Sequence, residues 1–197
     1  MADRQRIAVF ASGGGSNLGA LLEYLESLGD ARSADVALVI SDNAGAHALG
    51  RARQRDIATL ALADHSDGRS ICDALSEARI DLVVLAGYLK LLPAEVVAAW
   101  PRRIVNVHPG PLPRFGGHGM YGRRVHKAVL AAGESHTAVS VHFVDEEYDR
   151  GPVIAQWPVE IIPGDTAESL AERVLRAEHV VYPRVVDMVA ALISLKR

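Results

Sequence analysis

Cysteine is almost absent from this sequence, because Cys72 is the one thiol among 197 residues. A chain with a single thiol forms no internal disulfide, which excludes the disulfide-built scaffolds of small secreted proteins. The beginning of the chain has no signal-peptide pattern either, since the apolar run Ile7–Phe10 is too short for the core of one. We therefore expect a cytoplasmic protein whose stability comes from a hydrophobic core.

Long apolar runs and an excess of one charge are absent as well. No stretch approaches the roughly 20 apolar residues that a membrane-spanning helix needs. The 21 basic and 24 acidic residues leave a net charge of −3, which offers no broad positive surface to nucleic acid. We expect neither a membrane nor nucleic acid as a partner.

What the sequence does contain is the composition of a folded domain, with 49% hydrophobic and 23% charged residues. Over the first hundred residues, short apolar runs alternate with segments of helical periodicity, such as Leu18–Leu28. Continuous apolar strands that alternate with helices predict a parallel sheet covered on both faces. Strands are expected at 7–10, 36–40, 58–62, 81–87 and 104–108, and helices at 18–28, 44–55, 69–78 and 93–100.

The pattern changes in the second half of the chain. Two strand-like segments, 137–143 and 153–162, are joined by a short polar turn, which predicts an antiparallel hairpin. The fold class predicted is therefore α/β, a doubly wound and mostly parallel sheet with helices on both faces and an antiparallel C-terminal hairpin. We expect one domain over residues 1–197, with a nucleotide-binding half at 1–100 and a catalytic half at 101–197. The remaining helices are expected at 125–132 and 166–181.

Two signals concern the ends of the last helix. Thr166 is the expected N-terminal cap, and Ser169 three residues later predicts only half of a capping box. Pro183 is expected to kink or break the helix, because proline removes a backbone hydrogen bond.

A glycine-rich segment, Gly13-Gly14-Gly15-Ser16-Asn17, lies between a predicted strand and a predicted helix. Glycines let a backbone approach a ligand closely, and a helix start offers free N–H groups to an anion. The segment is not the dinucleotide fingerprint, since Leu18 stands where that pattern has its last glycine, and no Gly-Lys-Ser/Thr follows as in a P-loop. Two interpretations stay open: binding of a phosphate or carboxylate, which we favour, and a tight turn alone.

Asn106 and His108 lie at the end of a predicted strand, where alternate side chains point to one side. Because ligands of open α/β sheets bind beyond the carboxyl ends of the strands, we interpret the pair as an amide donor and an imidazole that face one crevice. The loop that follows, 109–122, holds three prolines and five glycines, and long loops of this kind are usually functional. Asp149 joins this group only if the fold brings it to His108, and is otherwise a turn residue.

Histidines are concentrated in the same region. Metal sites prefer a helical pair four residues apart or a mixed Cys/His set, and these histidines show neither spacing, so we expect no metal. His142 could face the crevice of Asn106 and His108. The five histidines that fall within 35 residues are His108, His118, His126, His136 and His142.

At this point the chain resembles the phosphoribosylglycinamide formyltransferases, a folate-dependent formyltransferase family of purine synthesis, over nearly its whole length. The motif around Asn106 and His108 is shared with other folate formyltransferases, and its combination with the Gly15-Ser16-Asn17 loop is specific. The loop Gly116–Gly122 is longer than in the shortest members. The segments that carry the resemblance are Ala8–Leu18, Val83–Leu92, Asn106–Pro109 with Leu112–Pro113, Ser140–Ile154 and Glu178–Pro183.

The resemblance implies a role for each matching residue. It implies a formyltransferase fold, 10-formyltetrahydrofolate as the co-substrate, folate binding by the catalytic half at 101–197, and no metal. It implies small-molecule substrates as the partners of a monomer or homodimer. Asn106, His108 and Asp149 would be the catalytic trio. Glycinamide ribonucleotide would contact Gly15, Ser16, Asn17 and Glu178, and the folate would contact Arg69, Leu89, Lys90, Leu91, Leu92 and Asn106.

The implied reaction is a direct formyl transfer. The substrate amine attacks the formyl carbon, and Asn106 and a protonated His108 are suitable donors to the oxyanion that develops. A carboxylate such as Asp149 would raise the pKa of His108 and aid the transfer of a proton from the amine to the folate nitrogen. Two other functions stay open: a formyltransferase for another amine or a 10-formyltetrahydrofolate hydrolase, and a nucleotide-binding module without catalysis. The hydrolases usually carry a further N-terminal domain, for which we expect no room here.

Overall fold

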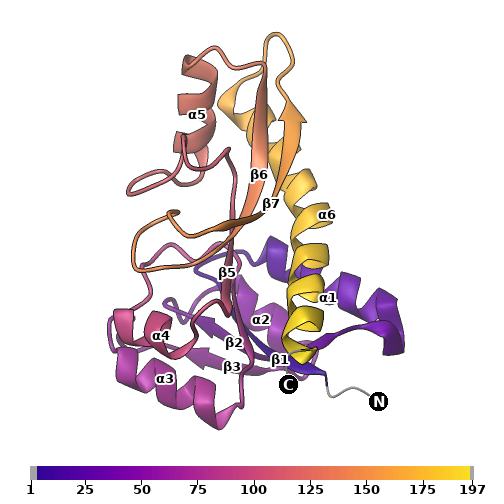
Figure 1. The fold of residues 1–197 in the computed structure, drawn as a ribbon, viewed down its shortest axis with the longest axis vertical. Helices are drawn as coiled ribbons and strands as arrows, with labels where there is room; N and C mark the ends of the chain where they lie inside the picture. Colours follow the sequence, from indigo (N-terminus) through magenta and orange to yellow (C-terminus); the bar gives the residue numbers. More distant parts are fainter. Residues whose placement is uncertain (1–3, 196–197) are drawn as a thin grey trace.

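A computed structural model of the chain describes residues 4–195, so that residues 1–3 and 196–197 of the expected domain lie outside the described residues. The described chain contains one seven-stranded sheet of order β3-β2-β1-β4-β5-β6-β7 (Figure 1). The strands are β1 Gln5–Phe10, β2 Ala34–Ser41, β3 Ala58–Ala61, β4 Leu82–Leu85, β5 Ile104–His108, β6 His136–Phe143 and β7 Val153–Glu160. The helices are α1 Ser16–Leu28, α2 His47–Arg53, α3 Gly68–Glu77, α4 Ala94–Ala99, α5 Arg123–Ala131 and α6 Ala167–Ser194.

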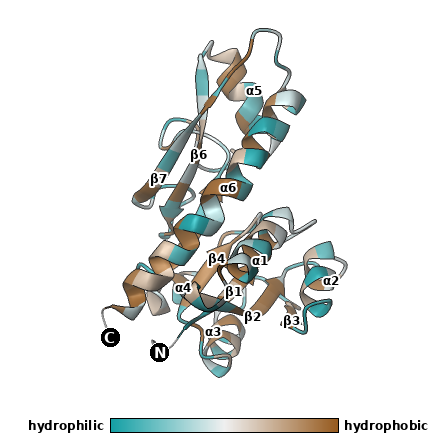
Figure 2. Ribbon diagram, turned by 90° about the vertical axis from the view of Figure 1, so that its right-hand side faces the viewer, coloured by the Kyte–Doolittle hydropathy of each residue, from teal (hydrophilic) through white to brown (hydrophobic). Residues whose placement is uncertain are grey.

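The predicted fold class is confirmed. Strands β1 to β5 pair in parallel, and β6 and β7 form an antiparallel hairpin on β5. Apolar residues of α1, α2 and α6 pack on one face of the sheet, and those of α3 and α4 pack on the other. In Figure 2 the strands β1, β2 and β4 are mainly hydrophobic, whereas helices such as α3 and α6 alternate hydrophobic and hydrophilic residues.

The strand order positions the site. β1 lies between β2 and β4, so the chain winds outward from β1 in both directions. The carboxyl ends of parallel strands that diverge in this way leave a crevice in which ligands of open α/β sheets bind. The hairpin β6–β7 extends beyond this edge, with α5 beside it, and α6 runs along the long axis of the molecule (Figure 1).

Of the kink or break expected at Pro183, a break does not occur, because the 28-residue helix α6 continues through this position. The neighbouring Tyr182 is fully buried, and its hydroxyl donates to the carbonyl oxygens of Leu85 at 2.9 Å and Val105 at 3.1 Å. A proline inside a helix costs about 3 kcal/mol, and this packing against β4 and β5 exceeds that penalty.

The start of α6 also differs from the expectation. Thr166 Oγ1 accepts from the Ser169 N–H at 3.2 Å, and Ser169 Oγ accepts from the Thr166 N–H at 3.0 Å. The capping box is therefore complete, since a serine hydroxyl does here what Glu or Gln usually does. Within residues 4–195 no helix combines the length and the apolar composition of a membrane span.

The second helix is shorter than expected. It begins at His47 rather than residue 44, because Asn43 Oδ1 accepts from the Gly45 N–H at 2.9 Å and closes a turn first. Asn and Asp side chains favour such turns by hydrogen bonding two residues on. This early turn brings the start of α2 against the glycine-rich loop, where the Ala48 N–H donates to the Gly13 oxygen at 3.1 Å.

Candidate active site

A pocket of about 580 Å³ lies at the carboxyl end of the parallel strands. Its walls come from the ends of β4 and β5, from α1 and α6, from the loop after β5 with the start of α5, and from the turn between β6 and β7. Both halves of the chain therefore contribute to it. Its size suits one or two small organic molecules.

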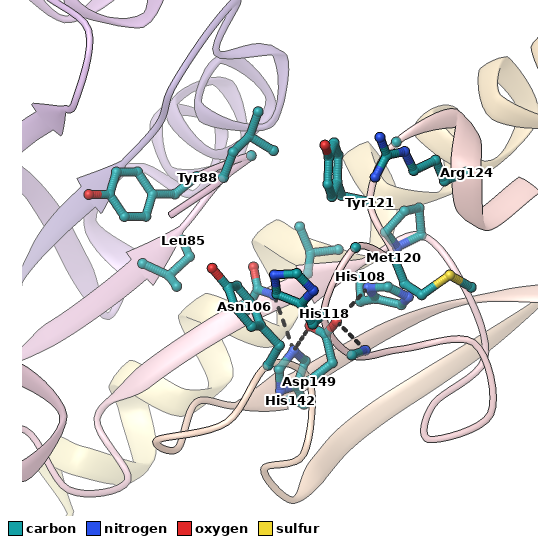
Figure 3. Close-up of a pocket in the computed structure, with 18 of the residues that line it drawn as sticks. Leu85, Tyr88, Asn106, His108, His118, Met120, Tyr121, Arg124, His142 and Asp149 are labelled. Carbon is teal, nitrogen blue, oxygen red and sulfur yellow. Dashed lines mark hydrogen bonds and ion pairs between the residues drawn. The ribbon is translucent and has the colours of Figure 1, made fainter. Parts of the chain in front are cut away.

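Asn106 and His108 project from β5 into this pocket (Figure 3). The antiparallel register places His142 of β6 directly opposite Asn106. Asn106 Nδ2 lies 3.2 Å from His142 Nε2, and His142 Nδ1 lies 2.8 Å from the Phe143 carbonyl oxygen. Because a carbonyl oxygen only accepts, His142 Nδ1 carries a proton. An amide has two N–H donors, so Asn106 keeps one for a ligand.

Asp149 lies beside both histidines, although it comes from the turn before β7. Its carboxylate oxygens lie 3.4 Å from His108 Nδ1 and 3.5 Å from His142 Nε2, and accept from the Gly117 N–H at 3.0 Å (Figure 3). The backbone of Asp149 has φ 57°, a left-handed conformation that a non-glycine residue adopts at a cost of roughly 1–2 kcal/mol. Strain of this kind is concentrated at functional sites.

The protonation of His108 corrects one expectation. Burial lowers the pKa of His108, and this effect exceeds the opposite effect of Asp149, so the pKa lies below its ordinary value rather than above it. The ring Nε2–H donates to the Phe115 carbonyl oxygen at 2.8 Å. Both ring nitrogens face oxygen atoms, so an imidazolium would donate a hydrogen bond from each. Desolvation nevertheless favours the neutral ring.

The carboxyl group of Asp149 behaves in the opposite way. Burial alone would raise its pKa, but the contacts with His142, His108 and the Gly117 N–H outweigh burial and hold the pKa below its ordinary value. Asp149 is therefore an anion near neutral pH, next to a buried neutral imidazole. The arrangement provides a place where a positive charge that forms during a reaction is stabilised.

On another wall of the pocket, Asn17 of α1 meets Glu178 of α6. Asn17 Nδ2 donates to Glu178 Oε2 at 2.7 Å, and both side chains are buried. Burial raises the pKa of Glu178 to about 7, while the Asn17 contact lowers it. Asn17 Oδ1 is buried and has no partner among residues 4–195, which leaves an acceptor for a ligand hydroxyl or N–H.

The segment that the resemblance assigns to the folate lies along the pocket. Leu89, Lys90, Leu91 and Leu92 all line it, together with Tyr88. Leu92 is buried, whereas Leu89 and Leu91 are 56% and 41% exposed. The arrangement offers an apolar surface to a flat ring system.

Arg69 does not belong to this group. It is the second residue of α3, exposed on the outer side of the sheet, and does not line the pocket. Arg69 therefore does not share the pocket that Leu89–Leu92 line, although the neighbouring Gly68 packs against Pro93.

The glycine-rich loop has a defined conformation beside the pocket. The carbonyl oxygens of Gly13 and Gly14 accept from the Ala48 N–H at 3.1 Å and from Arg51 Nε at 2.9 Å. Gly15 has φ 67°, and a Cβ there would lie 2.8 Å from Ala48 Cβ, so the close approach to α2 requires glycine. Of the residues predicted to bind the ribonucleotide, Asn17 and Glu178 line the pocket, whereas Gly15 and Ser16 lie next to it.

Two residues that sequence reasoning missed hold the loop after His108. Ser140 of β6 pairs in register with His108, and its hydroxyl donates to the Gly110 oxygen at 2.7 Å. Gln156 of β7 donates to Ser140 Oγ at 2.9 Å and to the Leu112 oxygen at 3.3 Å. The alternation of polar and apolar residues in β6 marked Ser140 as facing one side, but nothing in the sequence indicated the loop as its partner.

The histidines and the aspartate of this site are not arranged as metal ligands. Within the part of the chain that the structure describes, no group of three or more His, Cys, Asp or Glu residues has the arrangement of a metal site. His126 lines the pocket, and its buried Nδ1 has no partner among the described residues. Burial is the main cause that lowers the pKa of His126, and the electrostatic interaction with His108 lowers it further.

Comparison with known proteins is consistent with this geometry. The formyl transferase family model matches residues 5–186. The chloroplastic phosphoribosylglycinamide formyltransferase of Arabidopsis thaliana is 44% identical over 94% of this chain, which spans 65% of that protein's length. The crystal structure of phosphoribosylglycinamide formyltransferase from Anaplasma phagocytophilum is 37% identical, with a TM-score of 0.87 over 96% of this chain and 88% of that one.

A structure with a different activity in its name is also similar. The formyltetrahydrofolate deformylase from Pseudomonas syringae pv. tomato is 25% identical, with a TM-score of 0.83 over 94% of this chain and 61% of that one. The names of these relatives all refer to a formyl group, but two are formyltransferases and one is a deformylase.

Proposed function

Because this chain belongs to the formyl transferase family, we propose that it transfers the formyl group of 10-formyltetrahydrofolate to the amine of glycinamide ribonucleotide, a step of purine biosynthesis. The observation that carries the proposal is the pairing of Asp149 with His108, 3.4 Å apart, beside Asn106 in one pocket. When an amine attacks a formyl carbon, the developing oxyanion needs hydrogen-bond donors and the amine proton needs an acceptor. An amide, an imidazole and a carboxylate supply these groups.

The two walls of the pocket support two substrates. The apolar segment Leu89–Leu92 suits the flat pterin of a folate. Asn17 and Glu178 suit the hydroxyls of a ribose, because a carboxylate and an amide oxygen accept hydrogen bonds from such groups. We propose that Gly15 and Ser16 contribute backbone N–H groups near the phosphate. We propose one domain, 1–197, in which residues from both 1–100 and 101–197 contribute to the pocket that binds the two substrates.

The proposed mechanism begins with attack of the neutral amine on the formyl carbon. The carbonyl oxygen gains negative charge, and the free N–H of Asn106 donates to it. His108 contributes a second donor if its Nε2–H exchanges the Phe115 oxygen for the formyl oxygen. The negative charge of the oxyanion raises the pKa of His108 and so offsets the lowering of this pKa by burial.

Proton transfer completes the reaction. The attacking nitrogen becomes positively charged and must lose a proton, while the folate nitrogen must gain one before the carbon–nitrogen bond breaks. Asp149 is an anion near neutral pH and is placed to accept the first proton, directly or through a water molecule, and to return it to the leaving nitrogen. No covalent intermediate with the protein is needed, and 10-formyltetrahydrofolate is a co-substrate that leaves as tetrahydrofolate.

A spectrophotometric assay of tetrahydrofolate formation tests the function. Turnover that requires glycinamide ribonucleotide supports the proposal. Turnover without an amine would identify a hydrolase, the activity named in the Pseudomonas syringae relative. Absence of turnover with both substrates bound would leave a binding module.

The compartment and the assembly complete the proposal. We propose the cytoplasm, because a chain with a single cysteine suits a reducing environment, although the Arabidopsis relative is named chloroplastic. We propose small molecules as the partners, no metal, nucleic acid or membrane, and a monomer or homodimer. Cell fractionation and light scattering test these points.

A further inference from the structure

Three arginines lie in the loop after β5 and the first turn of α5, and two of them have a carboxylate partner. Arg114 contacts Glu134, and Arg123 Nη1 lies 3.0 Å from Glu168 Oε1. Arg124 has neither a carboxylate partner nor a side-chain hydrogen bond among residues 4–195. The guanidinium donors of Arg124 are therefore available to a ligand.

An aromatic ring holds Arg124 at the pocket. Its Cζ lies 4.9 Å from the centroid of the Tyr121 ring, and both residues line the pocket, on the side opposite Tyr88 (Figure 3). Stacking of this kind uses the face of the guanidinium and leaves the N–H groups at its edge free. A stacked guanidinium also loses less conformational freedom when it binds a ligand.

The substrates of the proposed function both end in an anionic group. The ribonucleotide ends in a phosphate monoester, and the folate ends in the carboxylates of its glutamate tail. A guanidinium donates two parallel hydrogen bonds to either group. Among residues 4–195, the lysines and arginines that line the pocket are Arg124, the paired Arg123 and Lys90, which lies in the segment after β4. The pocket thus presents one unpaired cation on each of two walls.

We propose that Arg124, stacked on Tyr121, binds the terminal anionic group of one substrate, a phosphate or a carboxylate. The inference rests on the proposed function, which supplies the two anionic substrates. It adds a binding residue from α5 to the predicted set, which comes from the glycine-rich loop, α3, the segment Leu89–Leu92 after β4, β5, the turn before β7 and α6. Among residues 4–195, Arg124 contacts neither His108 nor Asp149, so we expect it to contribute to binding and not to the chemical step.

Steady-state kinetics of Arg124→Met test the proposal. We expect the KM of one substrate to rise roughly tenfold with kcat nearly unchanged, as for the loss of a charge-assisted contact. A rise for glycinamide ribonucleotide identifies the phosphate, and a rise for the folate that grows with the number of glutamates identifies the carboxylate. Arg124→Lys should fall between, because it keeps the charge but not the planar pair of donors.

A matched control exists in the same loop. Arg114 also stacks on an aromatic ring, with its Cζ 5.0 Å from the Phe115 centroid, but it has a carboxylate partner and does not line the pocket. Arg114→Met should leave both KM values unchanged. Tyr121→Phe should retain binding and Tyr121→Ala should weaken it, because only the ring is needed for stacking.

Calorimetry separates this proposal from the proposed function. The affinities of wild type and Arg124→Met are measured for two probes, ribose 5-phosphate and a folate polyglutamate. Thermal unfolding first establishes that the variant is as stable as wild type. Wild-type binding of either probe that weakens roughly tenfold in the variant supports the anion site even without turnover. If wild type turns over and Arg124→Met keeps both KM values and both probe affinities, the anion site is wrong while the function stands. If neither probe binds wild type, the anion site is also wrong.

Discussion

Strands β4 and β6 differ in what they bury. Every residue of β4, Leu82–Leu85, is apolar and buried. In β6, Thr137, Ser140 and His142 are buried among apolar neighbours. The N-terminal half of the molecule thus has an apolar sheet interior with its polar groups at strand ends, whereas the C-terminal half places polar side chains inside the sheet itself.

This difference separates two ways of building a site. At the ends of the N-terminal strands, the site is formed by the conformation of the backbone, as in the glycine-rich loop, which packs closely against Ala48. In the C-terminal half, buried polar side chains need partners, and Ser140 has them in Gly110, Leu112 and Gln156. We therefore expect substitutions in the glycine-rich loop to change binding and stability, and those of the polar residues of β5 to β7 and of the turn before β7 to change kcat and pH dependence.

The largest effect is expected for the pair His108 and Asp149. Asp149→Asn keeps the shape but removes the anion, and should lower kcat on the order of 10²–10⁴-fold, as for a positioned acid–base group. His108→Ala should lower kcat at least as much. NMR titration of Asp149→Asn should show the His108 pKa moved lower still, because Asp149 opposes the effect of burial.

The double variant sharpens this prediction. Residues that act as one unit lose activity together, so His108→Ala/Asp149→Asn should be little worse than the worse single variant. Multiplication of the two losses would contradict the mechanism. Near-normal turnover of Asp149→Asn would return Asp149 to a turn residue.

The next effect concerns the buried carboxyl group of Glu178. Its pKa is about 7 in the folded protein, above the ordinary value of 4.5. Between these values the folded state holds a proton that the unfolded state has released, so stability falls as pH rises from 4.5 and levels off above 7. The full loss corresponds to about 3 kcal/mol in the free energy of unfolding.

Denaturant unfolding of wild type and Glu178→Gln from pH 4.5 to 8 measures this loss. The difference between the two proteins isolates Glu178, because buried histidines such as His126, whose pKa is lowered, produce the opposite slope in both. Glu178→Gln should lack the decline. Parallel stability curves would show that Glu178 ionises as it does in water.

The fold was largely predictable because hydrophobic periodicity depends on local sequence. Continuous apolar strands required two covering layers, and the polar turn before β7 required a hairpin. The errors arose where tertiary contacts override local propensity. Pro183 is tolerated because Tyr182 anchors α6 to two strands, which no local pattern reveals.

The site was predictable only in part. Asn106 and His108 were identified from their position at a strand end, and the roles of Asp149 and Glu178 came from resemblance alone. The left-handed backbone of Asp149 and the Ser140–Gln156 contacts depend on segments far apart in sequence. The direction of the His108 pKa was wrong because burial depends on the whole fold.

A smaller effect distinguishes two neighbouring glycines of the N-terminal loop. Gly15→Ala should destabilise the protein by about 1–2 kcal/mol and raise the KM for the ribonucleotide roughly fivefold or more, because φ is positive and Ala48 must move. Gly14→Ala meets no atom within 4 Å and should change neither value much. Thermal unfolding and kinetics of the two variants measure the contrast, and equal behaviour would show that loop shape is not what matters.

The smallest effect is expected for Gln156, which acts through Ser140. Gln156→Met keeps the size but removes both N–H donors, so the Leu112 oxygen and Ser140 Oγ each lose a contact. The loop they fix carries the Phe115 oxygen that holds His108. We expect kcat to fall roughly two- to fivefold with both KM values retained, since a misplaced group affects the chemical step.

A pH profile separates positioning from mere stability in this variant. If Gln156 positions the loop, the apparent pKa of kcat should shift in Gln156→Met, because the contact of His108 with Phe115 raises the His108 pKa and is weakened. The expected shift is toward lower pH. Trp157→Tyr, at the adjacent and outward-facing position of β7, is the control and should change neither kcat nor the profile. A lower melting temperature of Gln156→Met with unchanged kcat and profile would assign Gln156 a structural role alone, and the division between binding and chemistry would then not extend to the edge of the sheet.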